Sequence, residues 1–176
     1  MRLDLPLPTD RPMLIPDLKG AYPAYFIYGP LVFSKATVQF LSFLSNNTGV
    51  MNAFSFIKSP LLARRGDAPD IDREELVVIA SPFLTHRLSN GYTNPSGAVV
   101  ATVNGTAVRS LSHLVRLLRD LQDEFVTIEL DNRGGETLVF SRKEMIAATD
   151  EILTDNGVRA QGSADTMAVW QARPQK

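Results

Sequence analysis

The residues that could carry out hydrolytic chemistry are few in this sequence. It contains two histidines, His86 and His113, and no cysteine. A serine hydrolase needs a serine nucleophile, a histidine base and oxyanion donors in one place, yet no serine stands in a Gly-x-Ser-x-Gly elbow or a Gly-Asp/Asn-Ser-Gly-Gly run. Ser96-Gly97 is better explained as a turn before a strand, and His113 as a capping residue near a helix start. We therefore predict no catalytic site in this chain.

Metal and cofactor chemistry is predicted to be absent as well. Without cysteine there is no thiolate zinc or iron–sulfur site, and the two histidines form no His-x-x-x-His or His-Glu pair. The acidic run over residues 67–75 lacks the glycine and the terminal glutamate of a calcium loop. No Gly-x-Gly-x-x-Gly or Walker-type phosphate loop is present. The sequence thus predicts neither a metal nor a cofactor.

The charge balance excludes two further classes of partner. A net charge of −1 argues against electrostatic binding of nucleic acid and against a polybasic membrane anchor. No apolar run approaches the roughly 20 residues that span a bilayer, and the first residues lack the features of a signal peptide. We predict a soluble chain and leave its compartment, cytoplasmic or periplasmic, open.

Six segments rich in apolar and β-branched residues are predicted to form strands. They are residues 24–28, 31–33, 75–80, 98–103, 125–130 and 137–140. The run at 75–80 is almost continuously apolar, which is typical of a central strand covered on both faces. Asn104-Gly105 predicts a turn with positive φ after the fourth of these strands.

Apolar residues at helical spacing predict four helices. They cover residues 37–44, 50–63 with Pro60 interrupting, 111–122 and 144–155. Ser110 is the predicted N-cap of the third helix. Asn156-Gly157 is expected to end the fourth helix in the left-handed backbone region.

This order of elements predicts an α+β fold. We expect a small, partly open antiparallel β-barrel with a helical insertion and a C-terminal helix. Residues 1–22 are predicted to form a proline-rich linker, with Leu3 to Leu7 as the last strand of a preceding domain. Residues 23–158 would form the domain, with its insertion at about 34–72. Residues 159–176 would form a poorly ordered tail, in which Met167, Val169 and Trp170 could dock.

A peptide-binding geometry is suggested by the run from Tyr25 to Phe33. A Gly-hydrophobic loop before an edge strand can offer free backbone N–H groups to a peptide's terminal carboxylate, while the strand takes the peptide by β-augmentation. The run is similar to this loop of PDZ domains. It makes five residues candidates for peptide binding: Gly29, Pro30, Leu31, Val32 and Phe33. Taken alone, the same run is explained more simply as a hairpin with a Gly-Pro turn.

The segment over residues 100–111 adds a second resemblance to PDZ domains. It has the order strand, Asn-Gly, hydrophobic residue and helix. The apolar stripe of that helix is broader than one face, which suits a helix with one side on the core and one rim on a groove. Leu111 and Val115, four residues apart, are the predicted groove rim, with Arg119 one turn further on.

The full set of motifs resembles one family more closely. It is similar to the second, C-terminal PDZ-like domain of Deg/HtrA-type serine proteases, in the plant-type Deg branch. The matching stretches are residues 23–33, 75–80, 90–92, 103–105, 137–140 and 147–153, in the same order. The resemblance covers roughly residues 14 to 170.

This resemblance implies an atypical, non-catalytic PDZ domain whose parent is a trypsin-like serine endopeptidase. In that family PDZ domains serve proteolysis and protein quality control through substrate recruitment, internal-ligand binding and oligomer assembly. The expected partners are therefore protein or peptide segments and further copies of the chain, and the expected mechanism is strand addition beside Leu31 to Phe33. The alternative is a stand-alone PDZ-like scaffold without a protease partner.

Two departures from the family pattern favour an internal segment or a subunit contact over a free C-terminus. Pro30 removes one backbone N–H from the predicted binding loop. The long insertion carries apolar helices that could cover the groove.

Overall fold

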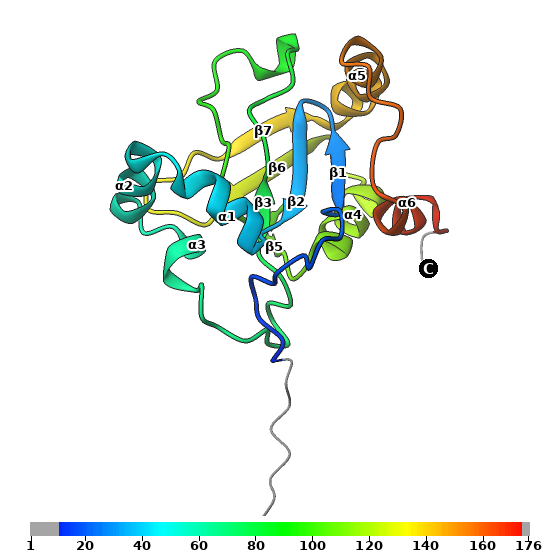
Figure 1. Cartoon of the computed structure of the whole chain (residues 1–176). Helices are drawn as coiled ribbons and strands as arrows, with labels where there is room; N and C mark the ends of the chain where they lie inside the picture. The colour runs from blue at the N-terminus through cyan, green and yellow to red at the C-terminus, as the bar shows by residue number, and fades with distance from the viewer. Residues whose placement is uncertain (1–10, 174–176) are drawn as a thin grey trace, which may run out of the picture.

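Two antiparallel sheets form the centre of the molecule (Figure 1). The computed structural model describes residues 11 to 173, and the statements below concern those residues. The first sheet has the order β1-β2-β3, formed by Tyr25–Tyr28, Leu31–Lys35 and Val77–Ile79. The second has the order β5-β4-β6-β7, formed by Thr106–Ala107, Val100–Val103, Phe125–Leu130 and Leu138–Ser141. The sheets meet at an isolated bridge between Val78 and Val99. The fold is α+β, as expected, and its strands form two antiparallel sheets and not a closed barrel.

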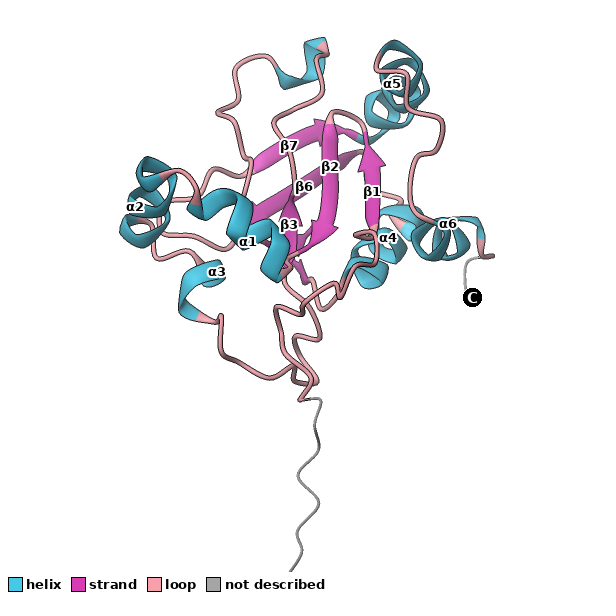
Figure 2. Cartoon of the chain, in the orientation of Figure 1, coloured by secondary structure: helices cyan, strands magenta, loops and turns pink. Residues whose placement is uncertain are grey.

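Six α-helices surround the sheets in the described part of the chain (Figure 2). Three of them, α1 (Val38–Ser45), α2 (Thr48–Phe56) and α3 (Pro60–Ala63), form the insertion between β2 and β3. The helix α4 (Leu111–Asp120) follows β5, α5 (Arg142–Asp155) follows β7, and α6 (Ala164–Gln171) comes last. A short 3₁₀ helix covers Arg87–Ser89. None of the helices within residues 11–173 is long and apolar enough to cross a membrane.

The main core lies between the two sheets and is closed by α4 and α5. Side chains of both sheets meet there, and Leu114 of α4 and Met145 of α5 are fully buried among them. Within β3, Val77 and Ile79 belong to this core while Val78 faces the opposite side. The strand is therefore covered on both faces, which confirms the prediction for the apolar run at 75–80.

A second core covers the opposite face of the first sheet. It joins Val78 and Val99 to side chains of the insertion and of the N-terminal segment, namely Leu14, Ile15, Leu41, Leu44, Phe54 and Leu61. The insertion thus forms a structural layer on the face of the sheet away from the main core. The sequence suggested that its helices could cover the groove, and the structure places them elsewhere.

Local chemistry explains where the elements begin and end. The side chains of Thr37 and Ser110 accept the backbone N–H of the third residue of α1 and α4, as an N-cap does. Asn104 and Gly105 both have positive φ, at 45° and 75°, which is the backbone of a two-residue primed hairpin turn. Gly157 follows α5 with φ of 63°, as predicted.

The C-terminal tail differs from the expectation of poor order. Residues 164–171 form α6, and Met167, Val169 and Trp170 pack against the main core. Local propensity did not indicate this helix because its hydrophobic contacts come from β1 and α4, which precede it by many residues. The strand predicted at Leu3 to Leu7 lies outside the described residues.

Candidate binding groove

The predicted strand-addition site beside β2 has no free edge. Residues 31–34 of β2 pair with β1, and residues 33–35 pair with β3 on the other side. The pairing on this side of β2 continues past the end of β3, because the carbonyl of Val32 accepts the N–H of Ala80 at 2.8 Å. A peptide could add beside Leu31 to Phe33 only by displacing a strand of the sheet.

The Gly29-Pro30 run is the tight turn between β1 and β2, and it is buried. Gly29 has φ of 53°, and a Cβ there would overlap the Met145 side chain of α5. Its N–H donates to Thr149 Oγ1 at 2.9 Å, so the turn holds no free donor at Gly29 for a carboxylate. Helix α5 therefore covers this turn, and the peptide-binding role of residues 29–33 stays a prediction.

Of the three predicted residues on α4, two are buried in the core and the third lies nearer the surface. Leu111 and Val115 are 3% and 0% exposed and belong to the main core. Arg119 lies at the surface side of α4, where its Nη1 donates to the carbonyl of Val169 in α6 at 2.7 Å. Arg119 thus connects α4 to α6.

The outer edge of β1 is paired with the chain's own C-terminal segment. Residues 161–163 run antiparallel to β1, with Gly162 opposite Phe26. The N–H of Ile27 donates to the carbonyl of Gln161 at 2.7 Å, and the N–H of Ser163 donates to the carbonyl of Tyr25 at 3.0 Å. The backbone groups of β1 that point away from β2, those of Tyr25 and Ile27, thereby face this segment.

Side chains of the same segment complete the pairing. Gln161 Nε2 donates to the carbonyl of Ile27 at 2.9 Å, and Ser163 Oγ accepts the N–H of Tyr25 at 3.1 Å. Thr166 Oγ1 donates to the carbonyl of Tyr25 at 2.8 Å. The edge of β1 is therefore saturated without any other molecule.

The helix α6 continues from this strand and lies against both β1 and α4 (Figure 1). The Trp170 ring lies 5.1 Å from the ring centre of Phe26 and 6.0 Å from that of Tyr28. We use the name β1–α4 groove for the surface of β1 and α4 that this C-terminal segment covers. We call its occupant, residues 161–171, the C-terminal arm.

A glycine is required where the arm crosses β1. A Cβ at Gly162 would lie 2.5 Å from Thr166 Oγ1, 3.0 Å from the carbonyl oxygen of Tyr25 and 3.1 Å from Cδ2 of Phe26. Gln-Gly-Ser is not a strand-forming sequence, so sequence reasoning missed the pairing. One indication in the sequence that this segment packs on the domain was the docking proposed for Met167, Val169 and Trp170.

Tyr28 places a buried hydroxyl in the core beneath the groove. The residue is 1% exposed, and its hydroxyl has no hydrogen-bond partner among the described residues. Burial disfavours the charged phenolate and raises the pKa of Tyr28 to about 12. The group is therefore a neutral, desolvated phenol.

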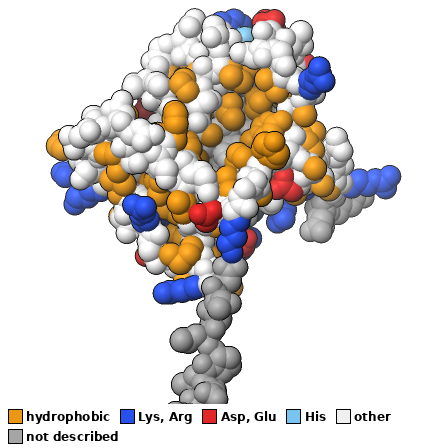
Figure 3. Space-filling view, in the orientation of Figure 1, with side chains coloured by type: hydrophobic (Ala, Val, Ile, Leu, Met, Phe, Trp, Pro, Cys, Tyr) orange, Lys and Arg blue, Asp and Glu red, His pale blue; other side chains and the backbone are white. Residues whose placement is uncertain are grey.

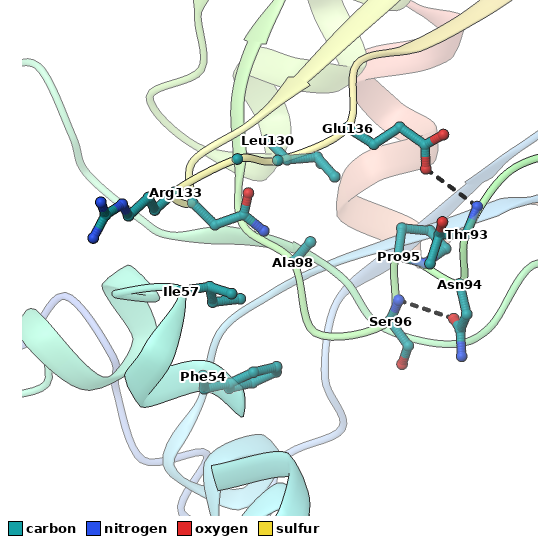
Figure 4. A pocket seen from close by; sticks show the side chains of 13 residues that line it. Phe54, Ile57, Thr93, Asn94, Pro95, Ser96, Ala98, Leu130, Arg133 and Glu136 are labelled. Carbon is teal, nitrogen blue, oxygen red and sulfur yellow. Dashed lines mark hydrogen bonds between the residues drawn. The ribbon is translucent and has the colours of Figure 1, made fainter. Parts of the chain in front are cut away.

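A separate cavity of about 420 Å³ lies between α2 and two loops (Figure 4). Phe54 and Ile57 face Pro95 and Ser96 across it, and Glu136 accepts the N–H of Thr93 at its rim. None of its lining residues belongs to the β1–α4 groove.

The side chains of the two histidines accept hydrogen bonds from nearby backbone N–H groups. His86 Nδ1 accepts the N–H of Leu88, and His113 Nδ1 accepts the N–H of Arg109, each at 3.2 Å. Neither imidazole is hydrogen-bonded to a serine hydroxyl in the described chain. No cluster of three metal-ligating side chains is found there either.

The surface of the face in Figure 3 carries no basic stripe. Hydrophobic side chains gather near its centre, while Lys, Arg, Asp and Glu side chains are scattered, mostly toward its edges. This distribution matches the small net charge of −1.

Comparison with known families identified a match over most of the chain. The model of a family described as PDZ domain matches residues 16–165, which include both sheets and the first five helices. A search of curated proteins found no match.

Proposed function

Because the chain belongs to the PDZ domain family, we propose that it is the interaction module of a Deg/HtrA-type serine protease of the plant-type branch. A PDZ domain is a non-catalytic module that binds peptides or proteins. In our proposal the β1–α4 groove binds an internal segment by strand addition, and the module contributes to oligomer assembly. The observation that carries the proposal is the complete pairing of the β1 edge by the C-terminal arm.

Backbone pairing supports the internal-segment mode. The arm makes two backbone hydrogen bonds to β1 and adds side-chain bonds at Tyr25 and Ile27. Each such bond contributes about 1 kcal/mol net, so an extended segment gains affinity without a terminal carboxylate. The arm continues into α6 instead of ending at the groove. A ligand that follows it would therefore be an internal segment.

Side-chain contacts support specificity in the same groove. Trp170 packs on Phe26 and Tyr28, and an aromatic side chain in such a pocket is a typical anchor. Arg119 anchors the helical part of the arm through the Val169 carbonyl. In this proposal Arg119 is a binding residue, and Leu111 and Val115 are core residues that hold α4 in place.

The protease parent is supported by the family resemblance of the whole motif order. The coding sequence upstream of Met1 separates the two candidates. A trypsin-like protease domain in the same reading frame supports the proposal, and its absence favours the stand-alone scaffold.

The groove is tested with Gly162→Val. The added side chain overlaps Thr166 Oγ1, which bonds to the Tyr25 carbonyl, and crowds that carbonyl and Phe26, so we expect the arm to leave the groove while the rest of the domain stays folded. Trp170 is the single tryptophan, so its emission should shift to longer wavelength. A fluorescein-labelled peptide of residues 160–173 should then bind the variant, measured by anisotropy, and should not bind the unmodified chain.

Gly66→Val is the matched control, because no atom lies within 4 Å of a Cβ at Gly66. It should leave the emission unchanged and bind no peptide. A Gly162→Val chain that is folded by circular dichroism and still binds no arm peptide would refute the proposed groove.

A further inference from the structure

We propose that the C-terminal arm exchanges between two copies of this chain, so that the β1–α4 groove of each copy holds the arm of the other. The inference rests on the proposed function, since it names the partner of the same groove. It also gives the proposed oligomer assembly a physical contact.

The link between α5 and the arm is short and lightly attached. The end of α5 is closed by two backbone bonds, from Gly157 N–H to Thr154 and from Val158 N–H to Leu153, at 3.1 and 2.8 Å. Arg159 and Ala160 follow, and both are exposed. The carbonyl of Ala160 accepts the Tyr25 hydroxyl at 3.1 Å. Changing the direction of the chain here therefore disturbs few buried contacts.

The groove contacts of the arm are made with parts that every copy of the chain contains. The helix α6 packs on α4 and β1, and residues 161, 163 and 166 bond to Tyr25 and Ile27. An arm from a second copy would make the same contacts. Exchange of an identical element in this way is a low-cost route to a symmetric dimer.

The shape of the groove favours the arm's own sequence over an unrelated segment. A Cβ at position 162 would lie 2.5 Å from Oγ1 of Thr166 in the arm itself and 3.0 Å from the Tyr25 carbonyl oxygen, so the arm can lie this close to β1 only with glycine there. Position 166 is fully buried and donates a hydroxyl hydrogen bond to the same carbonyl. The arm of this chain has glycine and threonine at these two positions, so the arm of a second copy would fit the groove equally well.

Concentration decides between closure within one chain and exchange between two. A short link gives the arm an effective concentration on the order of millimolar in its own groove, so isolated chains at low concentration close on themselves. An assembly that holds several copies together reaches comparable local concentrations. Exchange is therefore expected when copies are crowded.

Single-cysteine variants test the exchange, because the chain contains no cysteine of its own. Arg116 on α4 and Ala172 just after α6 line one small cavity between the two helices. We would unfold Arg116→Cys and Ala172→Cys chains in denaturant, mix them, refold them together at high concentration, and add a short bismaleimide cross-linker. Arg116→Cys mixed with Ser45→Cys, which lies on the insertion, controls for random collisions.

We expect a cross-linked dimer from the first mixture, in a yield at least several-fold above the control and rising with the concentration at refolding. Equal yields in the two mixtures would overturn the exchange. A chain lacking Arg159 and Ala160 provides a second measurement. The deletion shortens the reach of the link by about 7 Å and hinders closure within one chain. Light scattering should then report a dimer at micromolar concentration, whereas a folded monomer would overturn the proposal.

The outcomes separate this inference from the proposed function. If the arm peptide binds Gly162→Val but no exchanged dimer forms, the groove stands and the exchange is wrong. If the peptide does not bind the folded variant, the groove itself is wrong and the inference falls with it.

Discussion

Tyr28 and His113 show how burial decides the chemistry of single polar residues in this domain. Tyr28 lies on β1 with its hydroxyl buried and unpartnered among the described residues, while His113 lies in the first turn of α4. Both were apparent as polar residues in the sequence. Their protonation behaviour follows from the neighbours that packing brings to them.

The substitution Tyr28→Phe should stabilise the fold by about 1 kcal/mol. It removes a buried hydroxyl that makes no hydrogen bond and keeps the ring that packs on Trp170. Urea unfolding followed by circular dichroism measures the change. Tyr25→Phe is the control and should lose a little stability, because its hydroxyl bonds to Ala160. A loss of stability in Tyr28→Phe would mean that the hydroxyl has a partner.

His113 should make stability depend on pH in the range just below neutral. Burial, followed by the charges of Arg109 and Arg116, lowers the pKa of His113 below its usual 6.5, with Glu74 acting in the opposite sense. Below pH 6.5 the unfolded chain therefore binds more protons than the folded one, and stability falls as the pH falls.

His113→Asn places an amide oxygen near the position of Nδ1, as an acceptor for the Arg109 N–H, and removes the titration. Its unfolding midpoint in urea should be less sensitive to pH between 7 and 5 than that of the unmodified chain. Equal slopes over this range would show that His113 does not contribute.

At the scale of elements, a glycine fixes the insertion to the rest of the fold. Gly97 has φ of 84°, and the Phe54 ring of α2 lies where its Cβ would be. Phe54 is 8% exposed and belongs to the second core. The loop before β4 and the insertion are thus matched to each other in shape.

Gly97→Ala should therefore destabilise the domain by about 2 kcal/mol, from backbone strain and from overlap with Phe54. Chemical unfolding gives the value. Gly66→Ala is the matched control and should be nearly neutral, because its Cβ meets no atom. If the two variants unfold at the same denaturant concentration, the contact between Phe54 and Gly97 carries no weight in the stability.

At the scale of the whole molecule, the elements around the two sheets have different structural roles. The insertion covers one face of the first sheet, α4 and α5 close the main core, and the C-terminal arm fills the groove. The family match over residues 16–165 ends at the beginning of α6, just after the part of the arm that pairs with β1. The module is thus closed by a segment at the edge of the matched region.

Much of the fold could be predicted from local patterns. The strand at Phe125–Leu130, the Asn104-Gly105 turn and the Ser110 cap agree with the sequence because each depends on neighbouring residues. The predicted helix at 50–63 divides into α2 and α3 around Pro60, which begins α3 after the Ser59 cap. These agreements have local causes.

The candidate site was harder to predict because it depends on pairing between distant segments. The sequence by itself determined the strands, the turns, the caps and the resemblance to PDZ domains, since propensity and turn chemistry act over a few residues. Only the tertiary structure decided that β2 is central and that β1 is the edge. Tyr25 and Ser163 are 138 residues apart, and their pairing follows from how α5 and α4 pack, which no local pattern contains.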